Sequence, residues 1–346
     1  MVQELPAHIS DETELDRFMT IPSPNLVEDM ASFDGTLVIL GIGGKMGFTL
    51  GVQAVRAAEA AGEKLKVIGV SRFTDKQQRE KIEKAGIQTV VCDLLDRDAV
   101  DKLPDAERVV FMAGRKFGTT GYEGATWGMN TLVPGIAAER YRTSRLVAFS
   151  TGCVYPFVEA SSGGSRESDD VGPVGEYANS CLGRERVLQF MGDRFNTEIC
   201  IVRLNYAIDL RYGVLHDIGR AVFEGRRVDR SVPVFNAIWQ GDATDQILRC
   251  FALCSNPAAV INVTGPEIVS TVKTAEAFGD LFSKPVEYTG VEQSKAYINN
   301  SGRAISLFGY PRIPMDRMIG WTAEWIQGGG RSLDKPTHFE TSDGTY

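Results

Sequence analysis

The most informative segment of this 346-residue chain reads Leu37-Val38-Ile39-Leu40-Gly41-Ile42-Gly43-Gly44-Lys45-Met46-Gly47. Four apolar residues predict a buried strand, and three glycines spaced three apart follow it directly. Such a turn lets the backbone approach a pyrophosphate, and the free N–H groups of the next helix point at it. An ordinary turn is the alternative, but the place between a first strand and a first helix favours dinucleotide binding. The expected contacts are Gly41, Gly43, Gly44, Lys45, Met46 and Gly47.

Outward from this segment, short apolar runs alternate with longer amphipathic stretches. Six runs predict strands, at residues 37–40, 66–70, 89–91, 108–112, 145–149 and 198–202. Helical spacing of apolar residues predicts helices at 49–61, 76–85, 127–141 and 177–191. Strands that alternate with helices are typical of parallel sheets. The predicted fold class is therefore α/β, with a Rossmann-type doubly wound parallel sheet.

Composition and charge narrow the range of partners. Hydrophobic residues make up 43% of the chain, and 45 acidic against 37 basic residues give a formal charge of −8. Because Lys and Arg are not concentrated in any segment, we expect no nucleic-acid partner. The six scattered cysteines show neither disulfide nor metal-ligand spacing, and the apolar runs are too short for a membrane span. Residues 1–10 contain acid and proline where a signal peptide needs basic residues followed by an apolar run. These features predict a cytoplasmic protein with no metal and no membrane partner.

The two ends of the chain carry weaker signals. Ser10 is a candidate N-cap for a helix over residues 11–19, which Pro22 and Pro24 would end. This extension could cover the sheet or a partner subunit. The tail from 328 to 346 is rich in glycine and then polar, so we expect it to pack loosely or to exchange between subunits.

The end of the second strand bears on the choice of cofactor. Enzymes that bind NAD usually place Asp or Glu there, on the ribose hydroxyls, whereas this chain has Ser71 and Arg72. Ser71 can hydrogen-bond a 2′-phosphate and Arg72 can pair with it, which favours NADP over NAD. Asp75 is close enough in sequence to reach a ribose and keeps NAD open. After the third strand, Asp93, with Leu94 beside it, is placed to meet the adenine amine or to cap a helix.

With further motifs, the chain resembles the extended short-chain dehydrogenases/reductases, the NAD-dependent epimerase/dehydratase family, from about residue 36 to 325. Besides the glycines, the motifs are Ala113-Gly114, Asn130, Ser150-Thr151-Gly152-Cys153-Val154-Tyr155-Pro156, Tyr177, Arg203-Leu204-Asn205-Tyr206, Trp239-Gln240-Gly241-Asp242-Ala243 and Ile261-Asn262-Val263-Thr264-Gly265. The resemblance implies a dinucleotide-binding domain over 35–205 with a return segment at about 231–264. It also implies a smaller substrate domain and tail over 206–230 and 265–346, after a helical extension at 1–34.

The resemblance also implies roles for single residues. Tyr177 would act as general acid and base on a substrate hydroxyl or carbonyl, and Thr151, with Ser150 beside it, would hold the same oxygen. A capping hydroxyl or an aromatic residue at a helix start is the alternative for each. The cofactor contacts that the resemblance implies are Ala113, Gly114, Asn130, Tyr177, Cys181 and Leu204.

The chain departs from the family pattern Tyr-x-x-x-Lys, because Cys181 stands in the place of the lysine. That lysine lowers the pKa of the tyrosine, and a tyrosine at its reference pKa of about 10 is ionised to about one part in a thousand at pH 7. Three explanations stay open. Lys116 or Arg115, in the loop after the fourth strand, supplies the cation, whereas Arg184 is expected to turn away from that face of the helix. Alternatively the charge of the oxidised cofactor suffices, or the protein binds a dinucleotide without turnover, as a sensor or partner protein.

The expected substrate is a carbohydrate-like small molecule: a sugar, a sugar acid or a nucleotide sugar. Asn205 matches a substrate-contacting asparagine of the family, and the other candidates are Lys116, Thr151 and Arg211. His216 has a weaker claim, and the loop at 119–122 could frame the sugar ring. A diphosphate could meet Arg226, Arg227, Arg230 and Arg303, which read equally well as surface charges.

Two further properties follow from the resemblance alone. A homodimer is implied through the helices at 127–141 and 177–191. Epimerase and dehydrogenase activity stay open, because both use the same tyrosine and the same nicotinamide.

Overall fold

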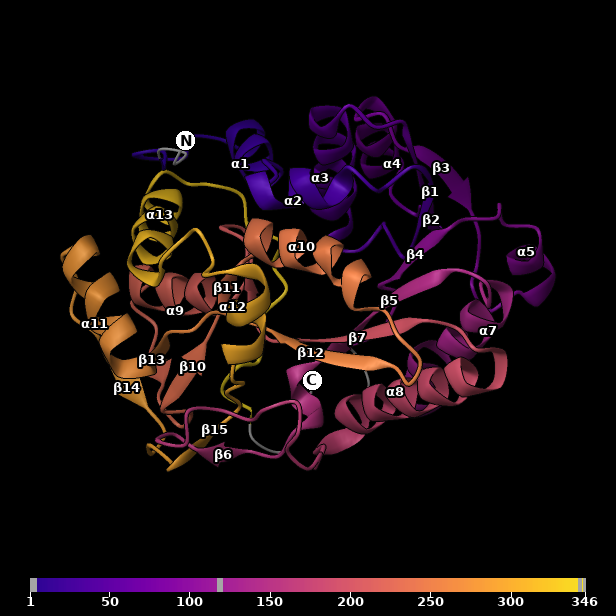
Figure 1. Cartoon of the computed structure of the whole chain (residues 1–346). Coiled ribbons are helices and arrows are strands. Elements are labelled where there is room, and N and C mark those ends of the chain that lie inside the picture. Colours follow the sequence, from indigo (N-terminus) through magenta and orange to yellow (C-terminus); the bar gives the residue numbers. More distant parts are fainter. Residues whose placement is uncertain (1–4, 117–120, 342–343, 345–346) are drawn as a thin grey trace.

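A seven-stranded parallel sheet forms the centre of the computed structural model, which describes residues 5–116, 121–341 and 344. The strand order is β12-β7-β5-β4-β1-β2-β3 (Figure 1). The strands are β1 (Gly35–Leu40), β2 (Leu65–Ser71), β3 (Gln88–Val91), β4 (Arg108–Phe111), β5 (Arg145–Thr151), β7 (Ile199–Leu204) and β12 (Ala259–Val263). All six predicted strands lie in this sheet, so the Rossmann-type doubly wound fold is confirmed. The order reverses between β1 and β4, and this switch point is where such sheets bind ligands.

Helices cover both faces of the sheet. One face carries α2 (Pro24–Met30), α3 (Gly47–Ala61), α4 (Lys76–Lys84) and α10 (Gln240–Arg249), and the other carries α5 (Arg97–Asp101), α7 (Val133–Arg140) and α8 (Gly175–Phe195). Leu37 and Ile39 of β1 face the first layer, and Val38 and Leu40 face the second. Because both faces are buried, the strands are continuous apolar runs.

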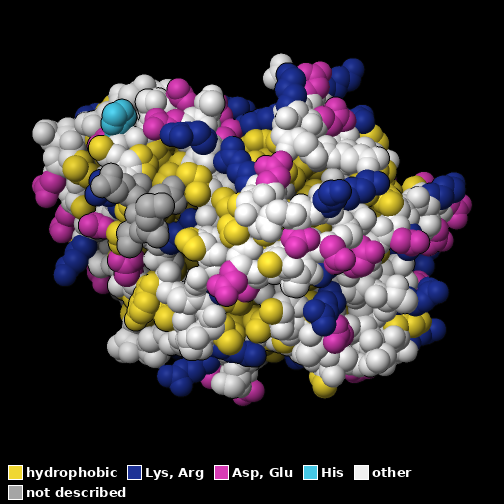
Figure 2. Space-filling model, turned by 45° about the horizontal axis from the view of Figure 1, so that its top comes forward, with side chains coloured by type: hydrophobic (Ala, Val, Ile, Leu, Met, Phe, Trp, Pro, Cys, Tyr) yellow, Lys and Arg dark blue, Asp and Glu magenta, His cyan; other side chains and the backbone are white. Residues whose placement is uncertain are grey.

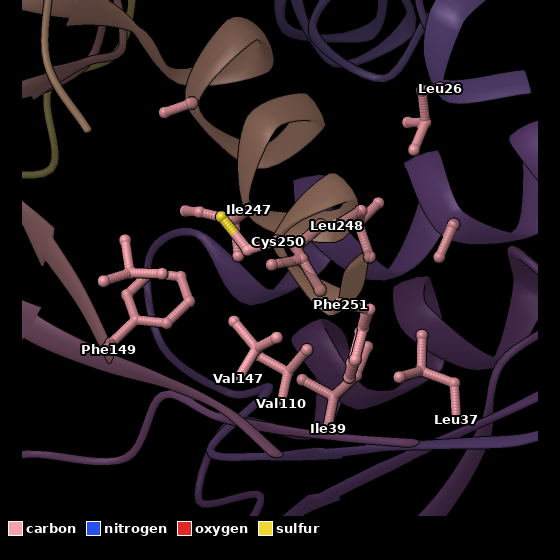
Figure 3. Close-up of a cluster of buried hydrophobic side chains, with 14 of the residues drawn as sticks. Leu26, Leu37, Ile39, Val110, Val147, Phe149, Ile247, Leu248, Cys250 and Phe251 are labelled. Atoms are coloured by element: carbon pink, nitrogen blue, oxygen red, sulfur yellow. The ribbon is translucent and has the colours of Figure 1, made fainter. Parts of the chain in front are cut away.

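The close-up of the first layer shows how the strands and α10 meet. Ile39, Val110 and Val147 point from the sheet toward Leu248 and Phe251 (Figure 3). A 3-10 helix, Cys250–Leu253, continues α10 here. This core holds α10 over the sheet, and with it the start of α10 next to the switch point.

The helix predicted at 127–141 is present in three parts. They are α6 (Glu123–Trp127), a π-helical turn over Gly128–Leu132, and α7. The π-helical turn carries Asn130, which is fully buried. Single π-helical turns of this kind often lie at functional sites.

The remaining elements build a smaller, second core. It contains α1 (Glu12–Met19), α9 (Val214–Phe223), α11 (Thr271–Phe282) and α13 (Met315–Gln327), packed around Trp239 and Trp321. A further helix, α12 (Gly302–Phe308), lies against β12. Short strand pairs complete it: β8 (Ala207–Ile208) with β11 (Ile238–Trp239), β9 (Val228–Asp229) with β14 (Tyr288–Thr289), β10 (Val234–Asn236) with β13 (Ile268–Ser270), and β6 (Val158–Glu159) with β15 (Lys295–Ala296). A 3-10 helix, Gly152–Val154, follows β5.

The N-terminal extension differs from its prediction in detail. Asp11, rather than Ser10, caps α1, because the Asp11 carboxylate accepts from the Glu14 N–H at 2.8 Å. Pro24 does not end a helix but occupies the first turn of α2, where its missing N–H costs nothing. The extension covers its own chain, since α1 contacts α10 and α2 contacts both α3 and α10 (Figure 1).

The C-terminal tail was expected to pack loosely or to exchange between subunits, and the first alternative is wrong for its described residues. The Leu333 N–H donates to the Arg211 carbonyl at 3.0 Å, and the N–H and hydroxyl of Thr337 donate to Asp217 at 2.7 and 2.6 Å. Phe339 is buried in the smaller core. The tail is therefore a fixed part of its own subunit.

The surface drawn in Figure 2 and the described helices bear on the expected partners. On the face drawn in Figure 2, Lys and Arg side chains are interspersed with Asp and Glu. Of the helices that the structure describes, none has the length and apolar character that crossing a lipid bilayer requires.

Candidate active site

The glycine-rich turn has the tight geometry that a bound pyrophosphate needs. Gly41 has φ +96°, and a Cβ there would lie 2.6 Å from the Ala113 nitrogen. A Cβ on Gly47 would lie 2.0 Å from the Ile42 carbonyl oxygen. Only glycine fits either position, because a side chain would collide with backbone. The turn and the start of α3 therefore form a cradle that fits a dinucleotide.

A cavity of about 430 Å³ extends from this turn along the carboxyl ends of β4, β5 and β7. Predicted residues on its wall are Gly43, Gly44, Lys45, Met46, Gly114, Lys116, Ser150, Thr151, Tyr177, Leu204 and Asn205. The structure thus brings together the glycine turn, the proposed acid/base and three of the predicted substrate contacts, Lys116, Thr151 and Asn205. Gln240, from the motif at 239–243, also lines it, as do Lys335 and Thr337 of the tail, which the sequence did not indicate.

Tyr177 and Thr151 meet inside this cavity. Thr151 ends β5, and its hydroxyl accepts from the Cys153 N–H at 3.2 Å. Burial raises the pKa of Tyr177 well above its ordinary value, whereas Arg184 and a hydrogen bond with Thr151 act to lower it. The tyrosine therefore needs cationic neighbours in order to act as a base near neutral pH.

Lys116 is one such neighbour. Its Nζ lies 5.9 Å from the centroid of the Tyr177 ring and donates to the Thr337 carbonyl at 3.3 Å. Burial lowers the pKa of Lys116, and the nearby Cys153 and Cys181 act to raise it. The structure therefore places the predicted substitute cation beside Tyr177.

Arg184 is a second cation, and the expectation that it turns away from this face is wrong. It follows Tyr177 by seven residues, which is close to two helical turns, so both lie on one face of α8 and both line the cavity. Its guanidinium donates to the Phe149 carbonyl at 2.7 Å and to the carbonyl and side-chain oxygens of Asn130 at 3.1 and 3.0 Å. The spacing of residues 177, 181 and 184 was a signal that could have indicated it.

Cys181 is almost fully buried, and burial raises its pKa to about 11, so it is a neutral thiol at pH 7. After burial, Cys181 and then Cys153 act to raise the pKa of Tyr177, so Cys181 does not replace the family lysine.

Ser150 and Asn130 are engaged in hydrogen bonds within the chain. The Ser150 hydroxyl donates to buried Glu185 at 2.5 Å, and Glu185 accepts from Arg203 at 3.0 and 2.7 Å. The side chain of Asn130 bonds the backbone N–H and carbonyl of Arg115, each at 2.8 Å. Ser150 is thus tied to the Glu185–Arg203 ion pair although it lies on the cavity wall, and Asn130 holds both the loop of Arg115 and the guanidinium of Arg184.

Other predicted contacts lie away from the cavity. Arg211 pairs with Asp209 at 2.7 Å and with Glu12 at 3.1 Å, which occupies its guanidinium within the chain. It lines a second cavity, of about 490 Å³, together with His216, whose Nε2 lies 3.1 Å from the Ser332 hydroxyl.

The acidic candidates near the adenine end serve local structure. Asp75 caps α4 by accepting from the N–H groups of Gln77 and Gln78 at 2.9 and 3.2 Å. Asp93 accepts from the Leu95 N–H at 3.1 Å, and Asp96 rather than Asp93 caps α5. Leu94 is buried.

The remaining candidates lie at the adenine end, in the loop at 119–122 and among the surface arginines. Ser71 lies against the turn, because a Cβ on Gly43 would meet its hydroxyl at 2.5 Å, and Arg72 is exposed. Thr119 and Thr120 lie outside the described residues. Tyr122, from the same loop, is exposed. The basic side chains of Arg226 and Arg227 pair with Glu224 and Glu287 at the surface.

Comparison with known proteins supports the same fold. Residues 38–208 match the model of the NAD dependent epimerase/dehydratase family. A UDP-glucuronic acid 4-epimerase from Bacillus cereus, solved in complex with NAD, is 17% identical, with a TM-score of 0.71 over 84% of this chain and 98% of that chain. A UDP-glucose 4-epimerase from Thermotoga maritima, solved with UDP-glucose, is 13% identical, with a TM-score of 0.65 over 85% and 99%. No curated protein sequence matches.

Proposed function

This chain belongs, through residues 38–208, to the NAD dependent epimerase/dehydratase family, and we propose that it transfers a hydride between a nicotinamide dinucleotide and a sugar. The observation that carries the proposal is the pairing of Tyr177 with Thr151 in a cavity that begins at the glycine turn. The enzyme is an epimerase or a dehydrogenase of a sugar, sugar acid or nucleotide sugar. The solved epimerases of this fold that contain NAD or UDP-glucose support a substrate of this class.

The arrangement suits removal of a proton from a substrate hydroxyl. In the oxidative direction, Thr151 donates to or accepts from the substrate oxygen, and Tyr177 takes its proton while the carbon gives up a hydride. The bound nicotinamide supplies the hydride acceptor. Lys116 and Arg184 lower the cost of the phenolate, as the family lysine does elsewhere. In the reverse direction Tyr177 returns the proton to the carbonyl oxygen.

The dinucleotide would be held by Gly41, Gly43, Gly44, Lys45, Met46 and Gly47, with Leu204 and Gly114 along the wall. We propose a preference for NADP over NAD. The end of β2 has no carboxylate at Ser71 or Arg72, so neither residue would repel a 2′-phosphate, and the carboxylate of Asp75 is engaged as a helix cap. A carboxylate that reads the ribose hydroxyls would favour NAD instead.

Calorimetric titration with NAD, NADH, NADP and NADPH tests these proposals together with the absorption spectrum of the purified protein. Retained NAD(H) would support an epimerase and contradict the NADP preference. Exchangeable binding with NADP preferred would support a dehydrogenase. Binding of none of the four would contradict the proposed function.

A homodimer and a cytoplasmic location complete the proposal. Trp127, Leu132 and Phe190 are large apolar side chains exposed on the helices through which the family dimerises, with exposed fractions of 38%, 52% and 58%. Their burial against a second copy would remove apolar surface from water. None of the six cysteines, all of which are described, forms a disulfide, which fits a reducing compartment.

A further inference from the structure

The charge of the residues that line the Tyr177 cavity contrasts with the charge of the whole chain. The chain carries a formal charge of −8. The described residues on the cavity wall include the five basic residues Lys45, Arg115, Lys116, Arg184 and Lys335, and no aspartate or glutamate. A wall of one sign concentrates ligands of the other sign. The cavity is therefore built for a ligand with negative charge.

Three of these residues come from separate parts of the chain. Lys45 follows the glycines of the turn, Lys116 follows β4, and Lys335 belongs to the tail. Lys45 extends over the ring of Tyr212, with its Nζ 3.2 Å from the ring centroid. Tyr212 and Lys335 line both the Tyr177 cavity and the second cavity. The three lysines thus gather where the two cavities adjoin.

The lysines influence one another. Burial, followed by the charges of Lys116 and Lys335, lowers the pKa of Lys45 to about 7. The carboxylates that act in the other direction on Lys45 are Asp217 and Asp209. Asp217 accepts two hydrogen bonds from Thr337, and Asp209 pairs with Arg211, so both are already engaged. Positive charges that lie close together lower one another's pKa, and a bound anion acts in the opposite direction.

The tail is held in place by contacts on both sides of Lys335. Asp334 pairs with Arg220 at 2.8 Å, and Thr337 bonds Asp217 and accepts from Lys116. Lys335 itself is exposed at the rim, so its position comes from these neighbours.

We propose that Lys335, brought in by the C-terminal tail, completes an anion subsite with Lys45 and Lys116 that binds a phosphate or carboxylate group of the ligand. The group belongs either to the diphosphate of the dinucleotide or to an acidic substrate. Both candidate sources of the anion, the dinucleotide and the substrate, come from the proposed function, so the inference rests on it. In both cases the tail is part of the binding site, and ligand affinity depends on a residue outside the family match at 38–208.

The test compares wild-type protein with Lys335→Met, with Lys335→Arg, which keeps the charge, and with Lys102→Met, which removes an exposed charge at the end of α5. Calorimetry follows ADP-ribose, which carries the diphosphate, and then D-glucuronate and neutral D-glucose on protein loaded with NADPH. Loss of one partly exposed charge contact corresponds to roughly a fivefold change in affinity. If the dinucleotide supplies the anion, Lys335→Met weakens ADP-ribose by this factor and Lys335→Arg restores it.

If the substrate supplies the anion, ADP-ribose binds Lys335→Met as it binds wild type. The loaded wild-type protein then prefers D-glucuronate to D-glucose, and Lys335→Met loses that preference. If Lys335→Met and Lys102→Met bind every probe with the same affinity, the proposed anion subsite is contradicted. Wild-type protein that binds no ADP-ribose contradicts the proposed function itself, so the two failures are distinguishable.

Discussion

The Nζ of Lys116 lies 5.9 Å from the centroid of the Tyr177 ring, although the two residues belong to different elements, the loop after β4 and helix α8. The family places its cation on the same helix as the tyrosine, four residues on, where this chain has Cys181. Arg184 follows Cys181 by three residues and also lines the cavity, so two cations lie near the Tyr177 side chain. Two cations from other positions thus lie near Tyr177, where the family has one lysine four residues after the tyrosine.

Replacement of Lys116 by methionine tests this assignment. Burial already raises the pKa of Tyr177, and loss of the ammonium group 5.9 Å from its ring centroid is expected to raise that pKa further, because a nearby positive charge stabilises a phenolate. We expect turnover in the oxidative direction at pH 7 to fall by about tenfold for each unit of pKa, with the acidic limb of the pH profile moved to higher pH. Lys116→Arg is the matched control and should keep most of the activity. An unchanged pH profile in Lys116→Met would show that Lys116 does not act on Tyr177.

Gly114→Ala tests the second cation through its packing. A Cβ on Gly114 would lie 2.7 Å from Nη2 of Arg184, whose buried guanidinium is held by three hydrogen bonds and cannot easily move away. Overpacking of this kind costs about 1–3 kcal/mol, so we expect a lower melting temperature together with reduced turnover. Gly124→Ala is the control, because a Cβ on Gly124 in α6 meets nothing within 4 Å. Equal stability and activity in both variants would contradict the close fit of Arg184.

Ser150→Ala and Thr151→Val separate two neighbouring hydroxyls. The Ser150 hydroxyl is bonded to Glu185, so its loss is expected to cost about 1–3 kcal/mol of unfolding free energy with turnover largely kept. Thr151 pairs with Tyr177, so Thr151→Val should lower kcat by at least tenfold with little effect on stability or dinucleotide affinity. Chemical denaturation and steady-state kinetics on both variants give the comparison. The reverse pattern would place Ser150 at the substrate oxygen.

The fold was predictable because its signals are local. The apolar run 37–40, the glycine turn and the helix at 49–61 follow one another in sequence, and the structure keeps that order in β1, the turn and α3. The acid/base candidate and Thr151 also came from short motifs at strand and helix ends. Such motifs report backbone geometry within a few residues.

Features that depend on distant partners were missed. The guanidinium of Arg211 is paired with Glu12, almost 200 residues earlier, so its sequence neighbours gave no sign that it was engaged. The tail is anchored on Asp217 and on the Arg211 carbonyl, which the composition of the tail does not indicate. Arg184 was misplaced for a different reason, because its helical position was compared with Cys181 rather than with Tyr177, two turns away.

Phe190→Glu tests the proposed homodimer. Phe190 is 58% exposed on α8, on one of the two helices that would meet their copies. A carboxylate placed in an apolar contact between subunits is costly, so we expect the variant to shift toward monomer in light scattering at micromolar concentration. Leu281→Glu is the matched control, since Leu281 is similarly exposed, at 48%, on α11 of the smaller core. A wild-type protein that is monomeric, or a Phe190→Glu variant as dimeric as the control, contradicts the proposal.

Proton uptake on ligand binding tests the environment of Lys45. Burial and the charges of Lys116 and Lys335 lower its pKa to about 7, so at pH 8 most molecules carry it neutral. A bound anion favours the ammonium form and raises the pKa, so binding at pH 8 must take up a proton. ADP-ribose affinity should therefore be constant below about pH 6, where Lys45 is already charged, and should fall as pH rises from 7 to 9. Calorimetry at pH 8 in two buffers of different ionisation enthalpy measures the uptake directly, and Lys45→Met should remove both the uptake and the slope. If Lys45→Met and wild type take up the same number of protons on binding ADP-ribose, another group takes up the proton. This result would contradict a contact between Lys45 and the diphosphate.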